Sequence, residues 1–95
     1  MMSEYYDKEG KPITLYKYGD LFEKCEYRRI GFTEVGEDTV STVWLGIDYS
    51  FGNSLPLIFE TMVFPDCEIC ERYSTLGQAK AGHERIVQEL RSFKK

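Results

Sequence analysis

The cysteines Cys67 and Cys70 form a C-x-x-C motif, a spacing at which two thiolates in a turn can hold one tetrahedral zinc ion. His83 follows at the spacing of a third zinc-finger ligand, but valine, glutamine and glutamate stand where the fourth would be. Cys25 can complete the set only if an N-terminal helix packs near residues 66–73. The first hypothesis for these residues is therefore a zinc site formed by Cys67, Cys70, His83 and Cys25.

The alternative for Cys67 and Cys70 is a pair of ordinary thiols in a connecting loop. A thioredoxin-like redox pair needs a strand that leads directly into a helix opened by the motif, and the sequence shows no such pattern. The three cysteines are an odd number and follow no export signal, which disfavours a disulfide framework. We therefore expect no cofactor, and zinc remains the alternative.

Asp48, Glu60 and His83 are the candidate acid–base groups. Paired carboxylates can do acid–base work when held roughly 5–9 Å apart, and Asp48 and Glu60 could face each other across a hairpin. His83 is the only histidine and so the only unperturbed side chain that titrates near neutral pH. A small hydrolase would need all three in one cleft. The competing interpretation puts Glu60 on a solvent face or beside Arg28 or Arg29, and His83 between core elements.

Acidic and tyrosine side chains are candidates for contact with a partner protein. The acidic ones flank the ends of predicted strands and are Glu34, Glu37, Asp38, Asp66, Glu68 and Glu71. Tyr5 and Tyr6 belong to a tyrosine-rich N-terminal segment, and exposed tyrosines give a large contact area at little cost in entropy. The same tyrosines are equally compatible with the core of a small domain.

The composition of the 95-residue chain narrows the classes of function. A net charge of −4 and the lack of a Lys/Arg run leave too few phosphate contacts for nonspecific nucleic-acid binding. No apolar run approaches the roughly 20 residues of a membrane span, and the N-terminus does not resemble a signal peptide. We expect one cytoplasmic domain over residues 1–95, with residues 1–12 flexible.

These groups must be positioned by a small set of helices and strands. Residues 39–48 and 57–64 predict two apolar strands joined by a Gly/Asn/Ser loop, and the first contains Trp44, which we expect to be buried. Residues 26–35 predict a strand that reaches residues 39–48 through a tight turn. The fold class is therefore α+β, with a three-stranded antiparallel meander in the order α-β-β-β-α.

Two helices are expected to cover this sheet. The first spans residues 15–24 behind an N-cap at Thr14, and its apolar stripe is Leu15, Tyr18, Phe22 and Cys25. The second follows a capping box formed by Thr75 and Gln78. Its apolar stripe is Ala79, His83, Ile86, Val87, Leu90 and Phe93.

Three strings of the sequence resemble a family of small uncharacterised proteins from bacteriophages, prophages and actinobacterial genomes. They are VSTVWLGID (40–48), PLIFETMVF (56–64) and ERYST…AGHERIV (71–87), with a weaker echo in YYDKEGKPIT (5–14), and the resemblance covers about two-thirds of the chain. The family carries no catalytic assignment, and the resemblance implies an accessory protein of a phage or mobile element. Many relatives lack the C-x-x-C motif, which lowers the weight of a zinc site.

The resemblance leads to a functional expectation by analogy. Small acidic phage proteins without catalytic motifs often bind a host protein, and inhibitors of bacterial defence complexes, including anti-CRISPR proteins, are one such class. We expect a non-enzymatic inhibitor of this kind, which occludes a host protein or complex in the cytoplasm of the bacterial host. The sequence leaves the partner and the oligomeric state open.

Overall fold

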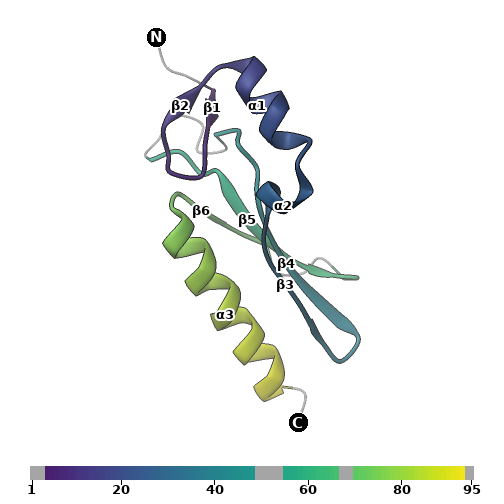
Figure 1. The fold of residues 1–95 in the computed structure, drawn as a ribbon. Helices are drawn as coiled ribbons and strands as arrows, with labels where there is room; N and C mark the ends of the chain where they lie inside the picture. The colour runs from purple at the N-terminus through teal and green to yellow at the C-terminus, as the bar shows by residue number, and fades with distance from the viewer. Residues whose placement is uncertain (1–3, 49–54, 67–69, 94–95) are drawn as a thin grey trace.

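The computed structural model of the chain describes residues 4–48, 55–66 and 70–93, which form a mixed α+β fold (Figure 1). The elements are, in order, β1 (Tyr5–Tyr6), β2 (Pro12–Ile13), α1 (Leu15–Phe22), α2 (Cys25–Arg28), β3 (Arg29–Val35), β4 (Asp38–Trp44), β5 (Phe59–Phe64), β6 (Cys70–Tyr73) and α3 (Leu76–Phe93). The main sheet is antiparallel in the order β3-β4-β5-β6, and α3 crosses one face of it.

The sheet has four strands, so the prediction of a three-stranded meander is wrong in that detail. The residues predicted as a polar connection include β6, whose Cys70 to Tyr73 pair with Met62 to Phe59 of β5. This strand has four residues with charged Glu71 and Arg72 at its centre, so it lacks the apolar alternation that marks a strand in a sequence. As an edge strand it can carry these charges, because among the described strands it pairs with β5 alone.

The other three predicted strands exist with shorter bounds. The strand predicted from residue 26 begins at Arg29, because residues 25–28 form the short helix α2. The strand predicted to end at Asp48 ends at Trp44, where the chain turns away through Gly46 with a positive φ of 77°. The backbone N–H groups of Leu45 and Gly46 both donate to the carbonyl of Ile58, just before β5 begins at Phe59.

The first helix begins where its N-cap predicted. The Thr14 hydroxyl accepts a hydrogen bond from the backbone N–H of Lys17, but α1 ends at Phe22, two residues early. The predicted apolar stripe is wrong for Leu15, Phe22 and Cys25, which are exposed, whereas the buried residue is Leu21. A helix of eight residues touches the core with little more than one turn, so the periodic pattern does not decide which face is buried.

Residues 5–13, most of which belong to the segment predicted to be flexible, form a hairpin bound to the core. Tyr5 pairs with Ile13 and Tyr6 with Pro12, and the backbone N–H of Tyr6 donates to the carbonyl of Gly46. The Asp7 carboxylate closes the turn by accepting hydrogen bonds from two backbone N–H groups. This Asx-type turn supplies the local bonds that a two-residue strand pair cannot supply alone.

Helix α3 carries the capping box and most of the stripe predicted for it. The Thr75 hydroxyl accepts from the backbone N–H of Gln78, and the Gln78 side chain accepts from that of Thr75, so both halves of the box are formed. Its buried residues are Ala79, Gly82, His83, Ile86 and Val87, and Leu90 is half-buried. The prediction fails at Phe93, which is 89% exposed beyond the end of the sheet.

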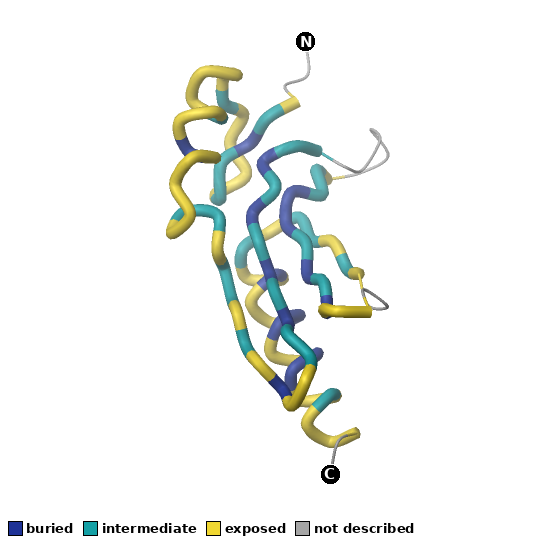
Figure 2. Tube along the Cα trace, turned by 90° about the vertical axis from the view of Figure 1, so that its right-hand side faces the viewer, coloured by how far each residue is buried: buried dark blue, intermediate teal, exposed yellow. Residues whose placement is uncertain are grey.

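The core consists of two apolar clusters separated by polar side chains. The first contains Tyr6, Leu21, Trp44, Ile58, Phe59 and Ala79, and the second Val35, Val40, Val63, Ile86 and Val87. Thr42, Thr61 and His83 are buried between them, each on an element that contributes to both clusters. Figure 2 shows the buried positions along β4, β5 and α3. None of the helices among the described residues is both long and apolar enough to span a membrane.

Trp44 is expected to be the most costly core residue to truncate. It is 1% exposed, its indole N–H donates to the carbonyl of Tyr6, and its ring meets that of Tyr27 edge to face. Trp44→Ala should lower the free energy of unfolding by about 3–5 kcal/mol in urea titrations. Tyr16→Ala is the control, because Tyr16 is 90% exposed and its removal should leave the midpoint nearly unchanged. Equal effects of the two substitutions would contradict the core described here.

Candidate functional site

The three predicted zinc ligands that the structure describes do not gather. Cys70 lies on the sheet face opposite α3, since it pairs with Met62, whereas His83 lies on α3. Cys25 is on α2, where its thiol accepts from the guanidinium of Arg28. Cys67 falls outside the described residues. Within the described part of the chain no group of three or more His, Cys, Asp or Glu side chains could hold a metal ion.

The predicted acid–base set is also dispersed. Glu60 lies on the face opposite α3, where it pairs with Arg72 at 3.1 Å and accepts from the thiol of Cys70. Asp48 follows β4 and accepts from the backbone N–H of Leu57 at 3.1 Å. His83 is buried on the helix side, so the sheet separates it from Glu60. The cross-strand pairing expected for Glu60 is formed, but with Arg72 rather than Arg28 or Arg29.

His83 instead anchors a polar layer that crosses the core, which we define as Thr33, Thr42, Thr61, Tyr73 and His83. The imidazole Nε2 lies 2.9 Å from the Thr33 hydroxyl, and Nδ1 lies 2.8 Å from the Thr42 hydroxyl. Thr42 bonds to Thr61, and the Tyr73 hydroxyl lies 3.1 Å from both Thr61 and the Glu71 carboxylate. Thr42 and Thr61 are 0% exposed, so these bonds replace water for both hydroxyls.

Counting donors fixes the direction of this hydrogen-bond chain. The ionised Glu71 carboxylate only accepts, so the single hydroxyl proton of Tyr73 points to it and Thr61 must donate to Tyr73. Thr42 then donates to Thr61, and the proton that Thr42 accepts comes from Nδ1 of His83. Nε2 is left as the acceptor for Thr33. One neutral tautomer of His83, with its proton on Nδ1, therefore satisfies every member.

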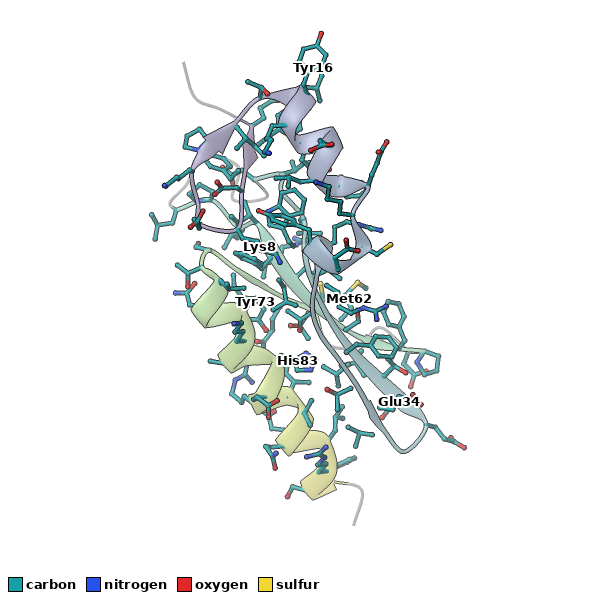
Figure 3. All side chains as sticks on the ribbon, viewed as in Figure 1. Lys8, Tyr16, Glu34, Met62, Tyr73 and His83 are labelled. Atoms are coloured by element: carbon teal, nitrogen blue, oxygen red, sulfur yellow. The ribbon has the colours of Figure 1, made fainter. Side chains whose placement is uncertain are left out.

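The outer end of the polar layer reaches a group of surface charges. Glu71 forms an ion pair with Arg85 of α3, and Arg85 also contacts Glu89 at 2.9 Å. Burial is the main cause that raises the pKa of the Tyr73 phenol above its usual value of 10.0. The phenol therefore keeps its proton and remains a donor at neutral pH. Figure 3 shows Tyr73 and His83 along the contact between α3 and the sheet.

The His83 ring also requires a glycine on β3. A Cβ atom added at Gly31 would lie 2.8 Å from the imidazole Cε1, closer than packed atoms approach. Beside the ring is a surface hollow of about 360 Å³, and Lys80 and Glu84 line its helix side. Burial lowers the pKa of His83 below 6.5, and the nearby Glu84 opposes this effect. The histidine is therefore held in its neutral form, and its ring bridges α3 to β3 and β4.

The sheet face turned away from α3 presents apolar side chains that sequence reasoning missed as a surface. Strand register places Phe32, Val43, Met62 and Phe64 on this face, which we call the open face. Phe32 and Phe64 are 51% and 42% exposed. On each strand, open-face residues are separated by an even number of positions, so their period of two was visible in the sequence. What the sequence did not show was that α3 packs on the other face of the sheet, which leaves this face without a long helix among the described residues.

Four of the six predicted acidic contact residues lie at one end of the sheet. Glu37 is in the β3–β4 turn, Glu34 and Asp38 flank it, and Asp66 follows β5 on the neighbouring strand. We call these four residues the acidic end. Figure 3 shows Glu34 projecting outward there. Among the described residues, Glu34, Glu37 and Asp66 have no ion pair.

The remaining predicted contact residues lie elsewhere. Glu71 is committed to Tyr73 and Arg85 on the helix side, and Glu68 falls outside the described residues. Tyr6 is 7% exposed within the core, so its side chain does not form part of a free surface. Tyr5 is half-buried and stacks on Tyr18 with ring centroids 4.6 Å apart. These tyrosines serve the core of the N-terminal hairpin.

The stability of the protein should depend on the charge of His83. Its folded-state pKa is lowered below 6.5, so in acid the unfolded chain takes up the proton first. The free energy of unfolding is therefore complete above pH 6.5 and falls as the pH drops from 6.5 toward the folded-state pKa. Urea titrations between about pH 7.5 and 5.5 measure this loss before most carboxylates titrate.

His83→Gln is the matched variant for this measurement. It should be less stable than the wild type by about 1–3 kcal/mol at neutral pH, because Thr33 and Thr42 lose well-placed partners. Its free energy of unfolding should change less than that of the wild type over the same pH range. A wild-type stability that stays constant or rises as the pH falls through this range would show that His83 is not held neutral.

The comparisons with known proteins add no relative to this geometry. No protein-family model matches the chain, and no curated protein and no solved structure matches it. The functional assignment therefore rests on the residues of the chain itself.

Proposed function

We propose that this protein is a non-enzymatic binding protein that attaches to a basic surface of a larger host protein. The observation that carries this proposal is that the acidic end and the open face are adjacent. They meet at Phe64, which pairs with Thr39 of β4 and precedes Asp66 by two residues. Apolar area contributes binding free energy, and the carboxylates select a partner of opposite charge.

The charge distribution supports a basic partner. Glu34, Glu37 and Asp66 are exposed carboxylates without ion pairs in the described structure, so their field is not neutralised locally. A group of like charges on one end of a small protein raises the rate of association with an oppositely charged surface. Such a surface is typical of proteins that bind nucleic acid, because they must neutralise phosphates.

The finer proposal is an inhibitor of a bacterial defence complex, similar in action to anti-CRISPR proteins. Its support is the acidic end, which would mimic the charge of a nucleic acid, and it follows the expectation from the sequence that the three strings belong to small phage and prophage proteins. The mechanism is occlusion: the protein covers a basic channel, and the nucleic acid can no longer enter. No bond is made or broken in this mechanism.

Affinity capture from the bacterial host, followed by measurement of the size of the complex, tests the proposal. The expected result is a stoichiometric protein partner larger than this chain. Glu37→Lys combined with Asp66→Lys should weaken its binding at least about tenfold, because like charges then face each other. The affinity of the wild type should also fall as salt is raised.

Glu9→Lys combined with Glu23→Lys is the matched control, because both glutamates are exposed and lie in the N-terminal part, away from the acidic end. This variant has the same net charge and should bind like the wild type. Recovery of no stoichiometric partner, or equal weakening by both double variants, would count against the proposal. So would submicromolar, sequence-independent DNA binding by the isolated protein in a gel shift.

A further inference from the structure

Strand β3 is an unpaired edge of the main sheet. It pairs with β4 on one side, and within the described residues no strand lies on its other side. Figure 2 shows this strand along the outside of the molecule, with only Val35 among its residues buried. Its outward backbone N–H and C=O groups can therefore accept another strand.

Backbone geometry restricts how β3 could pair with the β3 of a second copy. The backbone N–H and C=O groups that point away from β4 belong to every second residue of β3. In an antiparallel pair of β3 strands, odd-numbered residues must therefore lie opposite odd-numbered residues, and even-numbered residues opposite even-numbered ones. A two-fold axis at Phe32 meets this condition. It sets Phe32 opposite the partner's Phe32, both on the open face, and Gly31 opposite the partner's Thr33, both on the helix face.

The bulge in β3 makes the charges in this register complementary. Between Arg29 and Gly31 the strand gains one residue, so that Arg29 and Ile30 together oppose Val43 of β4. If Arg29 and Ile30 together also oppose one residue of a second β3, that residue is the partner's Glu34. Both side chains lie on the open face, because Arg29 pairs with Val43 and Glu34 with Thr39. The two-fold axis forms this contact twice.

The side chains and shape of the edge fit the same arrangement. Phe32 is 51% exposed, and the Arg29 guanidinium lies over its ring at 4.9 Å. Two such rings facing each other across the axis would be removed from water. A hollow of about 690 Å³ lies where α2 meets the first half of β3, and its lining includes Cys25, Glu26 and Gly31. In this register the partner's β3–β4 turn passes along this hollow.

We propose that two copies of this chain form a symmetric dimer by antiparallel pairing of their β3 strands about Phe32. The dimer joins the two four-stranded sheets into one and makes the two open faces continuous. Glu34 also belongs to the acidic end, so the test of the host partner uses Glu37 and Asp66, which lie outside the paired strand.

Sedimentation equilibrium over micromolar to submillimolar concentrations tests the pairing. The wild-type mass should rise from 11.1 kDa toward twice that value. Arg29→Glu and Glu34→Arg each place two like-charge pairs across the axis, and each should weaken self-association at least about tenfold. Circular dichroism should show that both variants keep the wild-type fold.

Charge exchange provides the decisive control. An equimolar mixture of the Arg29→Glu and Glu34→Arg chains should form a heterodimer, because every facing pair is then of opposite charge. The double variant Arg29→Glu/Glu34→Arg should dimerise again by itself. Glu9→Arg and Lys11→Glu, in the β1–β2 turn, should leave the wild-type mass unchanged. A wild type that remains monomeric, or single variants that the exchange does not rescue, would overturn the proposal.

Discussion

The polar layer in the middle of the core is the constraint on which the rest of the structure depends. His83 on α3 bonds to Thr33 of β3 and Thr42 of β4, and Thr42 bonds onward to Thr61 of β5. Leaving a buried polar group without a partner destabilises the fold by more than a formed hydrogen bond stabilises it. The folded state therefore has a low free energy for only one docking position of α3. The apolar clusters on either side supply most of the stability, and the layer between them selects the register.

Close packing reinforces this register. A Cβ atom at Gly31 would meet the His83 ring, and one at Gly82 would meet the ring of Tyr73, so both positions need a residue without a side chain. Because α3 is committed to one face of the sheet, the opposite face keeps Phe32, Met62 and Phe64 at the surface. The features available for binding are thus a consequence of how the core is closed.

The sequence predicted those elements whose signals are local. The Thr75–Gln78 capping box, the α3 stripe from Ala79 to Leu90 and burial of Trp44 follow from short patterns, and the structure confirms them. Strand β6 escaped prediction because its central residues are charged and its pairing with β5 is not local.

The candidate site was less predictable, for a reason of the same kind. His83 was expected to bridge core elements, as it does, but its partners Thr33 and Thr42 lie some forty to fifty residues away in sequence. Within the candidate zinc and acid–base sets, strand alternation keeps Cys70 and Glu60 apart from His83, because it places them on the opposite face of the sheet. Faces of a sheet are set by register, and register emerges only when the strands are paired.

The protonation state of His83 tests the central claim most directly. Nitrogen-15 NMR of the imidazole at a pH above 7 distinguishes the two neutral tautomers from each other and from the charged ring. The hydrogen-bond chain from His83 to Glu71 requires a neutral ring with its proton on Nδ1 and Nε2 free to accept from Thr33. A ring protonated on Nε2 alone, or one that exchanges between tautomers as in a free peptide, would contradict this account.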